Sequence, residues 1–529
     1  MGRSFIRTGA AVALAGLLAT GVTGCTVSAD PLGTGSAGAS GSAAPTASAK
    51  SDGKASAAPG GSPGLPAALT GQRPAWKRCA APEGGEAPGS SWRCADVRVP
   101  LDYAEPAGRT IPVALIRKEA GSPDARIGSL LFNFGGPGGS GVDILPRGAA
   151  EYTALNTRYD LVSFDPRGVQ RSAGVVCRDD KEQERAERTV DSTPETAAEE
   201  RAFRADATDF ARGCARRSGT VLPYTTTDNT ARDMDLIRQV LGDDKLNYFG
   251  ISYGTQLGAA YAHLFPGNVG RMVLDAVVDP TADSVGHARN QTIGFQRALD
   301  NYLKSTGQDP KDGTRRIARL LERLDRRPLA VGDRRLNDSL ALTGVVMPLY
   351  SEQSWPLLTS ALTKAEGGSG AELLALADWY NDRDARGHYS TQSHAQRAIS
   401  CADSAERPTL AQARALLPEF RGLSPVFGAF LAWDTAGWCA DWPVKGATTT
   451  MDASAPGAAA ILVVGTTGDP ATPYEGAERM AKALGAGVGV LVTNKGEGHG
   501  AYGSSSCATK TIDAYLLSAK VPAYGTTCG

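Results

Sequence analysis

Residues 246–258, L-N-Y-F-G-I-S-Y-G-T-Q-L-G, contain the motif around which this chain of 529 residues is organised. Apolar, strand-forming residues run into Gly250, and a segment with helical character follows Gly254. Ser252 lies between the two glycines and completes the pattern G-x-S-x-G in the strand-to-helix context of a nucleophile elbow. A side chain at either glycine would collide with so sharp a turn. The stretch therefore predicts that Ser252 is a nucleophile whose hydroxyl stands above a sheet.

Strand-like and helical segments alternate on both sides of this motif. The strands are predicted at 127–134, 159–164 and 269–278, with helical segments at 178–213 and 227–241. This alternation predicts a parallel sheet with helices on both faces, and the runs at 94–100 and 110–117 predict a hairpin before it. Catalytic groups on such sheets lie at the carboxyl ends of strands. The glycine cluster at 135–141, Asp165 and Ser252 all fall there.

The pattern changes between residues 281 and 443. Helices are predicted at 286–304, 314–324, 354–364, 371–380 and 409–420, with no convincing strand between them. The α/β pattern then resumes in residues 444–529, with strands at 458–465 and 488–492 and helices at 474–484 and 509–517. We therefore expect an α/β domain of residues 73–280 and 444–529, interrupted by a helical lid of residues 281–443. An insertion of this size also explains a chain too long for one small core.

The N-terminus predicts export. Arg3 and Arg7 precede a short apolar run, and V-T-G-C at residues 22–25 resembles a bacterial lipoprotein signal in which Cys25 is lipidated. A plain secretory signal is the alternative. Residues 26–72 are rich in Ser, Ala, Gly and Pro, a composition that predicts a disordered tether because little apolar surface can be buried. We expect a lipid-anchored protein at the extracytoplasmic face of the cell membrane, or one released to the medium.

The cysteine content and the net charge further limit the kind of protein that this chain can be. Of nine cysteines, eight remain without Cys25, and an even number in an exported chain predicts disulfides. Pairing of nearest neighbours is the simplest arrangement, although the sequence alone leaves the connectivity open: 79–94, 177–214, 401–439 and 507–528. The net charge of −1 gives no argument for a nucleic-acid partner. No ligand spacing predicts a metal, no cofactor is implied, and we expect a monomer.

A nucleophilic serine needs a base, and the base needs a carboxylate. Among five histidines, His499 lies in a glycine-rich loop after a strand and follows Ser252 in the order Ser, Asp, His. Asp469 lies on the loop after the preceding strand and is predicted to hold His499. Asp275 and Asp279, after an earlier strand, are its rivals.

An acyl-transfer serine also needs hydrogen-bond donors for the tetrahedral oxyanion. One donor is predicted to be the backbone N–H of Tyr253, the residue after the nucleophile. The other is predicted to be the N–H of Gly136, from the glycine cluster after an early strand. A phosphate-binding role for this cluster is disfavoured because G-x-x-x-x-G-K-[ST] is missing and G-x-G-x-x-G opens no helix there.

The motifs together carry a specific resemblance. They are N-F-G-G-P-G-G-S-G, F-D-P-R-G, G-I-S-Y-G-T, G-D-P-A-T-P and G-H-G, in that order along the chain. This set resembles the α/β-hydrolase peptidases related to prolyl iminopeptidase, and more narrowly the secreted tripeptidyl aminopeptidases of actinobacteria, called mycelium-associated proteinases when they are lipoproteins. Phe134 stands where the prolyl iminopeptidase pattern has His. The resemblance runs from about residue 76 to the C-terminus. It implies an α/β-hydrolase fold with a lid and the release of short peptides, often tripeptides, from a free N-terminus.

An enzyme of that kind must bind the ammonium group of its substrate, which a carboxylate in the lid would do. The candidates are Glu352, Asp403, Glu406 and Asp434, and Asp403 is our first choice because it lies near Cys401. The tryptophans of the lid either line a substrate pocket or form its core: Trp433, Trp438 and Trp442.

Two alternative functions stay open from the sequence. A carboxylesterase of the same fold would use the same catalytic groups. A surface lipoprotein that only binds peptides would suit a tether and two lobes, but it has no need of Ser, Asp and His at three strand ends.

Overall fold

The computed structural model describes residues 64–82, 85–448 and 450–529. The predicted signal and Cys25 lie outside these residues. The folded chain begins earlier than residue 73, because helix α1 (Ala67–Thr70) packs Leu69 into the core. The side chain of Gln72 then exchanges hydrogen bonds of 2.8 Å with the backbone of Arg98. The predicted tether is therefore too long at this end, since Leu65 and Leu69 supply apolar surface that the preceding residues lack.

One twisted sheet of ten strands forms the centre of the α/β domain, in the order β1-β2-β3-β5-β4-β6-β7-β10-β11-β12. The strands are β1 (Lys77–Arg78), β2 (Trp92–Pro100), β3 (Thr110–Lys118), β4 (Gly128–Asn133), β5 (Tyr159–Phe164), β6 (Leu246–Ile251), β7 (Val269–Asp275), β10 (Ile461–Gly468), β11 (Gly489–Glu497) and β12 (Thr526–Cys528). β2 and β3 form the predicted antiparallel hairpin, and β3 pairs antiparallel with β5. All pairs from β5 to β12 are parallel, as the alternation predicted.

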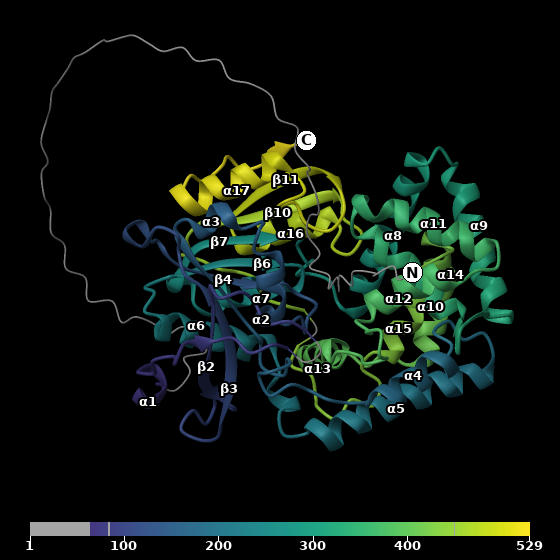
Figure 1. Ribbon diagram of the computed structural model, residues 1–529, viewed down its shortest axis with the longest axis horizontal. Helices are drawn as coiled ribbons and strands as arrows, with labels where there is room; N and C mark the ends of the chain where they lie inside the picture. Colours follow the sequence, from purple (N-terminus) through teal and green to yellow (C-terminus); the bar gives the residue numbers. More distant parts are fainter. Residues whose placement is uncertain (1–63, 83–84, 449) are drawn as a thin grey trace, which may run out of the picture.

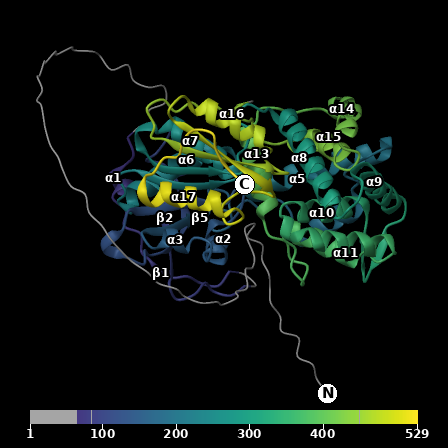
Figure 2. The same cartoon turned by 90° about the horizontal axis from the view of Figure 1, so that it is seen from above.

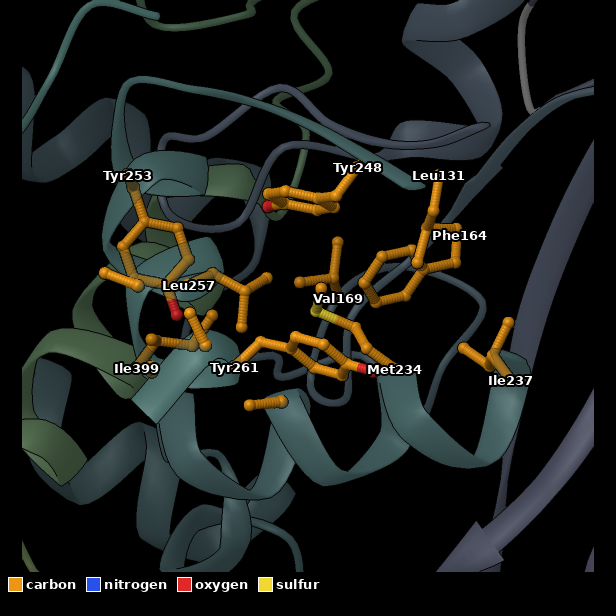
Figure 3. Packing of buried hydrophobic residues seen from close by; sticks show 14 of the residues in the cluster. Leu131, Phe164, Val169, Met234, Ile237, Tyr248, Tyr253, Leu257, Tyr261 and Ile399 are labelled. Carbon is orange, nitrogen blue, oxygen red and sulfur yellow. The ribbon is translucent and has the colours of Figure 1, made fainter. Parts of the chain in front are cut away.

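Helices cover both faces of this sheet (Figures 1 and 2). One face carries α6 (Thr227–Leu241), α7 (Tyr253–Leu264) and α16 (Tyr474–Leu484), and the other carries α2 (Gly141–Gly148), α3 (Thr153–Asn156) and α17 (Ser506–Ser518). Successive strand residues point to opposite faces, so Leu131 joins the first core and Phe132 the second. Figure 3 shows the first core, where Met234 and Leu257 pack on Tyr248 and Phe164 of the sheet.

A second hydrophobic core belongs to the helical part, whose helices lie beside the sheet domain in Figure 1. Its helices are α8 (Ser284–Ser305), α9 (Pro310–Arg326), α10 (Asp338–Leu349), α11 (Trp355–Glu366), α12 (Ala371–Tyr380), α14 (Leu410–Leu423) and α15 (Gly428–Gly437). The sequence predicted all of these except α10 and α15. Nine of the twelve residues of α10 are buried, and a helix that is apolar on nearly all sides shows no helical period.

The prediction that the lid holds no strand is wrong. A short antiparallel hairpin joins β8 (Leu329–Val331) to β9 (Arg334–Leu336) through the two-residue turn Gly332-Asp333. Glycine at the first turn position adopts a φ of 61°, as hairpin turns of this length require. Strands of three residues are too short to show the alternation from which strands are predicted.

The helical part also does not coincide with residues 281–443. Helices α4 (Asp180–Thr189) and α5 (Ala197–Ser218) run along its lower side, and Phe203 packs on Trp433 with ring centroids 6.1 Å apart. Conversely, α13 (Gln392–Asp403) falls in the predicted lid but packs in the core of the sheet domain. Figures 1 and 2 show α13 between the sheet domain and the other helices.

The described residues form four disulfides, and they confirm the nearest-neighbour pairing. The pairs are Cys79–Cys94, Cys177–Cys214, Cys401–Cys439 and Cys507–Cys528. Within residues 64–82, 85–448 and 450–529, no helix combines the length and apolar character needed to cross a bilayer.

The motif F-D-P-R-G has a structural role at the edge of the first core. Arg167 is fully buried and paired with Asp233 at 2.6 Å, and it also donates to the carbonyls of Pro100 and Leu101. Asp165 accepts a hydrogen bond of 2.6 Å from Ser140, the N-cap of α2. The motif thus fixes the start of α2, directly after the glycine cluster.

Candidate active site

Ser252 occupies the turn between β6 and α7 with φ 59° and ψ −126°. A positive φ costs about 1–2 kcal/mol for a residue with a side chain, so the surrounding contacts must hold it. The Ser252 N–H donates to the carbonyl of Asp275 at 3.1 Å, and Thr255 donates twice to the Ser252 carbonyl. The expected collisions are also present, since a Cβ on Gly250 would strike Gly254 and one on Gly254 would strike Asn133. The elbow predicted from the sequence is therefore confirmed as a conformation.

His499 and Asp469 lie together at the ends of neighbouring strands β11 and β10. Nδ1 of His499 is 2.9 Å from both carboxylate oxygens of Asp469, which is fully buried. Asp469 also accepts hydrogen bonds from the backbone N–H groups of Ala471 and Thr472 and from the Thr472 hydroxyl. Burial alone would lower the pKa of His499, but the charge and hydrogen bond of Asp469 outweigh it, so this pKa lies above its ordinary value.

Asp275, the rival of Asp469, connects the two halves of the site. Its carboxylate accepts the N–H groups of Ala501 at 3.0 Å and Tyr502 at 2.9 Å, while its carbonyl accepts the Ser252 N–H. It therefore holds the loop that carries His499 against the elbow that carries Ser252. The other rival, Asp279, instead pairs with Arg479 at 2.9 Å.

The glycine cluster lies directly against the elbow. A Cβ on Gly135 would come within 2.8 Å of Ser252 Cβ and 3.0 Å of the Tyr253 nitrogen. Gly135 and Gly136 have φ values of 81° and 109°, which glycine adopts readily. The structure thus brings the loop of Gly136 beside the N–H of Tyr253, as two oxyanion donors would require.

Tyr350, which no sequence motif indicated, closes the site from the lid. Its carbonyl accepts the His499 N–H at 2.8 Å, and its ring lies edge-on to the imidazole with centroids 5.3 Å apart. The ring of Tyr380 follows at 6.2 Å from that of Tyr350. Tyr350 lies in the turn after α10, where nothing in the local pattern predicts contact with a residue so far along the chain.

The lid acids differ in what they contact. Both oxygens of Asp403 are occupied by Thr227, whose N–H donates at 2.8 Å and whose hydroxyl donates at 2.5 Å. Glu406 accepts the N–H of Ser284 at 2.8 Å, and Glu352 is exposed at the surface. The side chain of Asp434 makes no hydrogen bond to any other described residue.

The remaining aromatic and titratable candidates pack in the core or contact the backbone. Trp433 and Trp442 are buried in hydrophobic clusters, and the Trp438 carbonyl accepts from Arg397. His263 is partly exposed, and its Nδ1 lies 2.7 Å from the carbonyl oxygen of Ser454, which precedes β10. No group of three or more His, Cys, Asp or Glu side chains in the described ranges could hold a metal ion.

Comparison with known proteins places these features in a family. Residues 424–528 match the family described as TAP-like protein. The Serine protease Hip1 of Mycobacterium tuberculosis is 36% identical over 468 residues, which cover 82% of this chain and 87% of that protein. The chain belongs to the TAP-like family of α/β hydrolases. It is therefore a serine hydrolase, and a purely peptide-binding lipoprotein is not retained as an alternative.

Other TAP-like relatives carry two kinds of name. The Tripeptidyl aminopeptidase of Streptomyces lividans is 33% identical over 481 residues, covering 86% of each chain. Carboxylesterase B of Mycobacterium tuberculosis is 36% identical over 492 residues, covering 89% of this chain and 92% of that protein. Both peptidase and esterase names thus occur at similar identity within the TAP-like family.

Proposed function

We propose that the chain is a serine exopeptidase that releases short peptides, tripeptides above all, from a free N-terminus. The observation that carries this proposal is the hydrogen-bonded pair Asp469–His499, linked through Asp275 to the strained elbow of Ser252. The names Tripeptidyl aminopeptidase and Serine protease Hip1 among its relatives support a peptide substrate.

The mechanism follows from the roles that this geometry supports. Ser252 Oγ attacks the scissile carbonyl while Nε2 of His499 takes the hydroxyl proton, and Asp469 holds Nδ1–H of the imidazole. The backbone N–H groups of Tyr253 and Gly136 stabilise the resulting oxyanion. His499 then returns the proton to the leaving amine, and water hydrolyses the acyl-enzyme by the same steps in reverse order.

In this proposal Asp434, rather than Asp403, binds the amine of the substrate. Each oxygen of Asp403 already accepts a hydrogen bond from Thr227, whereas the side chain of Asp434 lies in the lid and makes no hydrogen bond to any other described residue. Burial and the negative charge of Asp434 raise the pKa of Tyr380. The ring of Tyr380 is 6.2 Å from the ring of Tyr350, the residue that covers His499. Burial raises the pKa of Asp434 to about 6 although Arg397 opposes this, and an ammonium group would stabilise the charged carboxylate.

The proposal also includes export of the protein from the cytoplasm. Four disulfides favour an oxidising compartment, and we retain the prediction that the chain is lipidated at Cys25 and acts on peptides outside the cytoplasm as a monomer.

A comparison of three substrates tests the exopeptidase assignment. The purified protein is assayed with a tripeptidyl chromophore substrate, its N-acetylated form and a simple aryl ester, and Ser252→Ala serves as the inactive reference. We expect rapid turnover of the free-amine substrate and little turnover of the acetylated one. Equal rates on both would overturn the exopeptidase assignment, and unchanged turnover by Ser252→Ala would overturn the nucleophile.

The amine receptor has its own test. Asp434→Asn should raise KM for the free-amine tripeptide at least tenfold and leave KM for the aryl ester within twofold. Glu322→Gln removes the same charge from an exposed acid of α9 and is the matched control. An Asp434→Asn variant with the KM of the wild type would reject this residue.

A carboxylesterase is the second candidate, favoured by the name of the relative Carboxylesterase B. The same catalytic groups cleave esters, so the aryl ester decides between the two. A kcat/KM for the ester that exceeds that of every free-amine peptide by orders of magnitude would favour the esterase.

A further inference from the structure

One helix, α13, connects to both residues that the proposed mechanism uses as oxyanion donors, to Gly136 through its carbonyl and to Tyr253 through its side chain. Its first half lies on the glycine cluster, where a Cβ on Gly138 would come within 2.6 Å of the Gln392 carbonyl oxygen and 2.8 Å of the Gln396 nitrogen. The side-chain amide of Gln396 donates to the carbonyl of Gly136 at 3.1 Å. This bond holds the carbonyl of Gly136, in the peptide next to the one that carries its predicted donor N–H.

The last residue of α13 reaches the side chain of the second donor residue through a chain of hydroxyl groups. Asp403 accepts from the hydroxyl of Thr227 at 2.5 Å, and that oxygen lies 2.5 Å from the hydroxyl of Tyr253. Tyr253 follows the nucleophile, so its backbone N–H is the other predicted donor. Tyr253 is only 6% exposed, and Ile399 of α13 belongs to the same buried cluster, as Figure 3 shows.

Helix α13 is itself held firmly to the rest of the protein. Ala395, Ala398 and Ile399 lie in the core of the sheet domain. Cys401 is bonded to Cys439, and the Arg397 guanidinium donates to the carbonyl of Gly437 at 2.5 Å. The helix is therefore a fixed support rather than a lid element that swings, which suits it to hold other groups in position.

We propose that α13 sets the geometry of the oxyanion hole, with Gln396 positioning Gly136 and Asp403 positioning Tyr253 through Thr227. This inference rests on the proposed function, because it assigns the role of these two peptide groups. Oxyanion donors act at 2.7–3.1 Å from the developing charge, so a small displacement of either peptide weakens stabilisation of the transition state. Gln396, Thr227 and Asp403 are positioning residues and touch no reacting atom.

The proposal predicts a defect in kcat with every substrate. Gln396→Met and Thr227→Val keep the side-chain size and remove the hydrogen bonds, and each should lower kcat about tenfold with KM within twofold, since removing a donor outright lowers it by about 10²–10³. The aryl ester should show the same loss as the tripeptidyl substrate. Ser393→Ala, on the exposed side of α13, is the control and should keep wild-type kcat.

A tetrahedral inhibitor separates positioning from a general structural effect. A boronic-acid peptide forms an adduct on Ser252 whose oxygen occupies the oxyanion hole, so its affinity should fall by the same factor as kcat. The affinity of a peptide product should stay unchanged. Boronate affinity that stays at the wild-type value while kcat falls would overturn the proposal, as would wild-type kcat in both variants.

Asp403→Asn distinguishes this role from amine recognition. As a positioning residue, Asp403 affects kcat on the ester and on the peptide alike, and Tyr253→Phe should reproduce that loss. A rise in KM confined to the free-amine substrate would instead make Asp403 the amine receptor and overturn its positioning role. Failure of this inference is distinguishable from failure of the exopeptidase assignment, because the ester assay with Ser252→Ala as the inactive reference measures kcat in either case.

Discussion

Gly138→Ala tests the contact between the glycine cluster and α13 most directly. Gly138 has a φ of 96°, which costs about 1–2 kcal/mol for alanine. The added Cβ would also lie 2.6 Å from the Gln392 carbonyl oxygen, 2.8 Å from the Gln396 nitrogen and 3.1 Å from the Ala395 Cβ. Overpacking against backbone of this kind typically adds about 1–3 kcal/mol. The total strain is about 2–5 kcal/mol.

The loop has to relieve this strain, because α13 is fixed by the core and by its disulfide. A displacement that weakens transition-state stabilisation by about 1.4–2.8 kcal/mol lowers kcat about ten- to a hundredfold. The assay is steady-state hydrolysis of the tripeptidyl substrate and of the aryl ester, combined with urea unfolding monitored by tryptophan fluorescence.

Gly242→Ala is the matched control. Gly242 ends α6 with a φ of 79°, and a Cβ there would meet nothing within 4 Å. It should lower the free energy of unfolding by about 1–2 kcal/mol and leave kcat unchanged. If Gly138→Ala keeps the kcat of the wild type while Gly242→Ala loses stability as expected, the reasoning about the contact with α13 is refuted.

Three further predictions follow from the described contacts. Asp469→Asn should lower kcat about 10⁴-fold because its amide favours the wrong tautomer of His499. In the wild type, activity should rise with pH through a midpoint above 6.5, since the neutral imidazole is the base and its pKa is raised; the variant should move this midpoint down. Arg167→Met leaves a buried carboxylate uncompensated and should lower the free energy of unfolding by about 3–5 kcal/mol, measured by urea titration; a change below about 1 kcal/mol would contradict this. Serines in place of Cys401 and Cys439 open a loop with a sequence separation of 38, which should destabilise the protein by about 4 kcal/mol and lower kcat; a change in stability alone would argue against a fixed α13.

Much of the geometry of the candidate site could be predicted because its signals are local. The elbow of Ser252 depends on the sterics of five consecutive residues, so the glycine spacing reveals the turn wherever it occurs. Asp469 and His499 were found by a weaker rule, the carboxyl ends of successive parallel strands. That rule also admitted Asp275, and only the structure shows that Asp275 binds backbone N–H groups while Asp469 binds the imidazole.

The lid was predicted less well for physical reasons. Helix α10 is apolar on nearly every side, and the β8–β9 hairpin is too short to show a period. The choice of Asp403 for the substrate amine relied on a neighbouring cysteine, which says nothing about what the carboxylate contacts. In the structure its oxygens bind Thr227, a residue 176 positions earlier.

The α/β alternation, the nucleophile elbow and the glycine cluster can be predicted without a structure, because each follows from the sterics and periodicity of a short segment. The place of α13 in the core of the sheet domain and its bond to the glycine cluster are visible only in the tertiary structure. The bond from Gln396 to Gly136 spans 260 positions. Contacts over such separations depend on how the elements pack, and no local pattern encodes that packing.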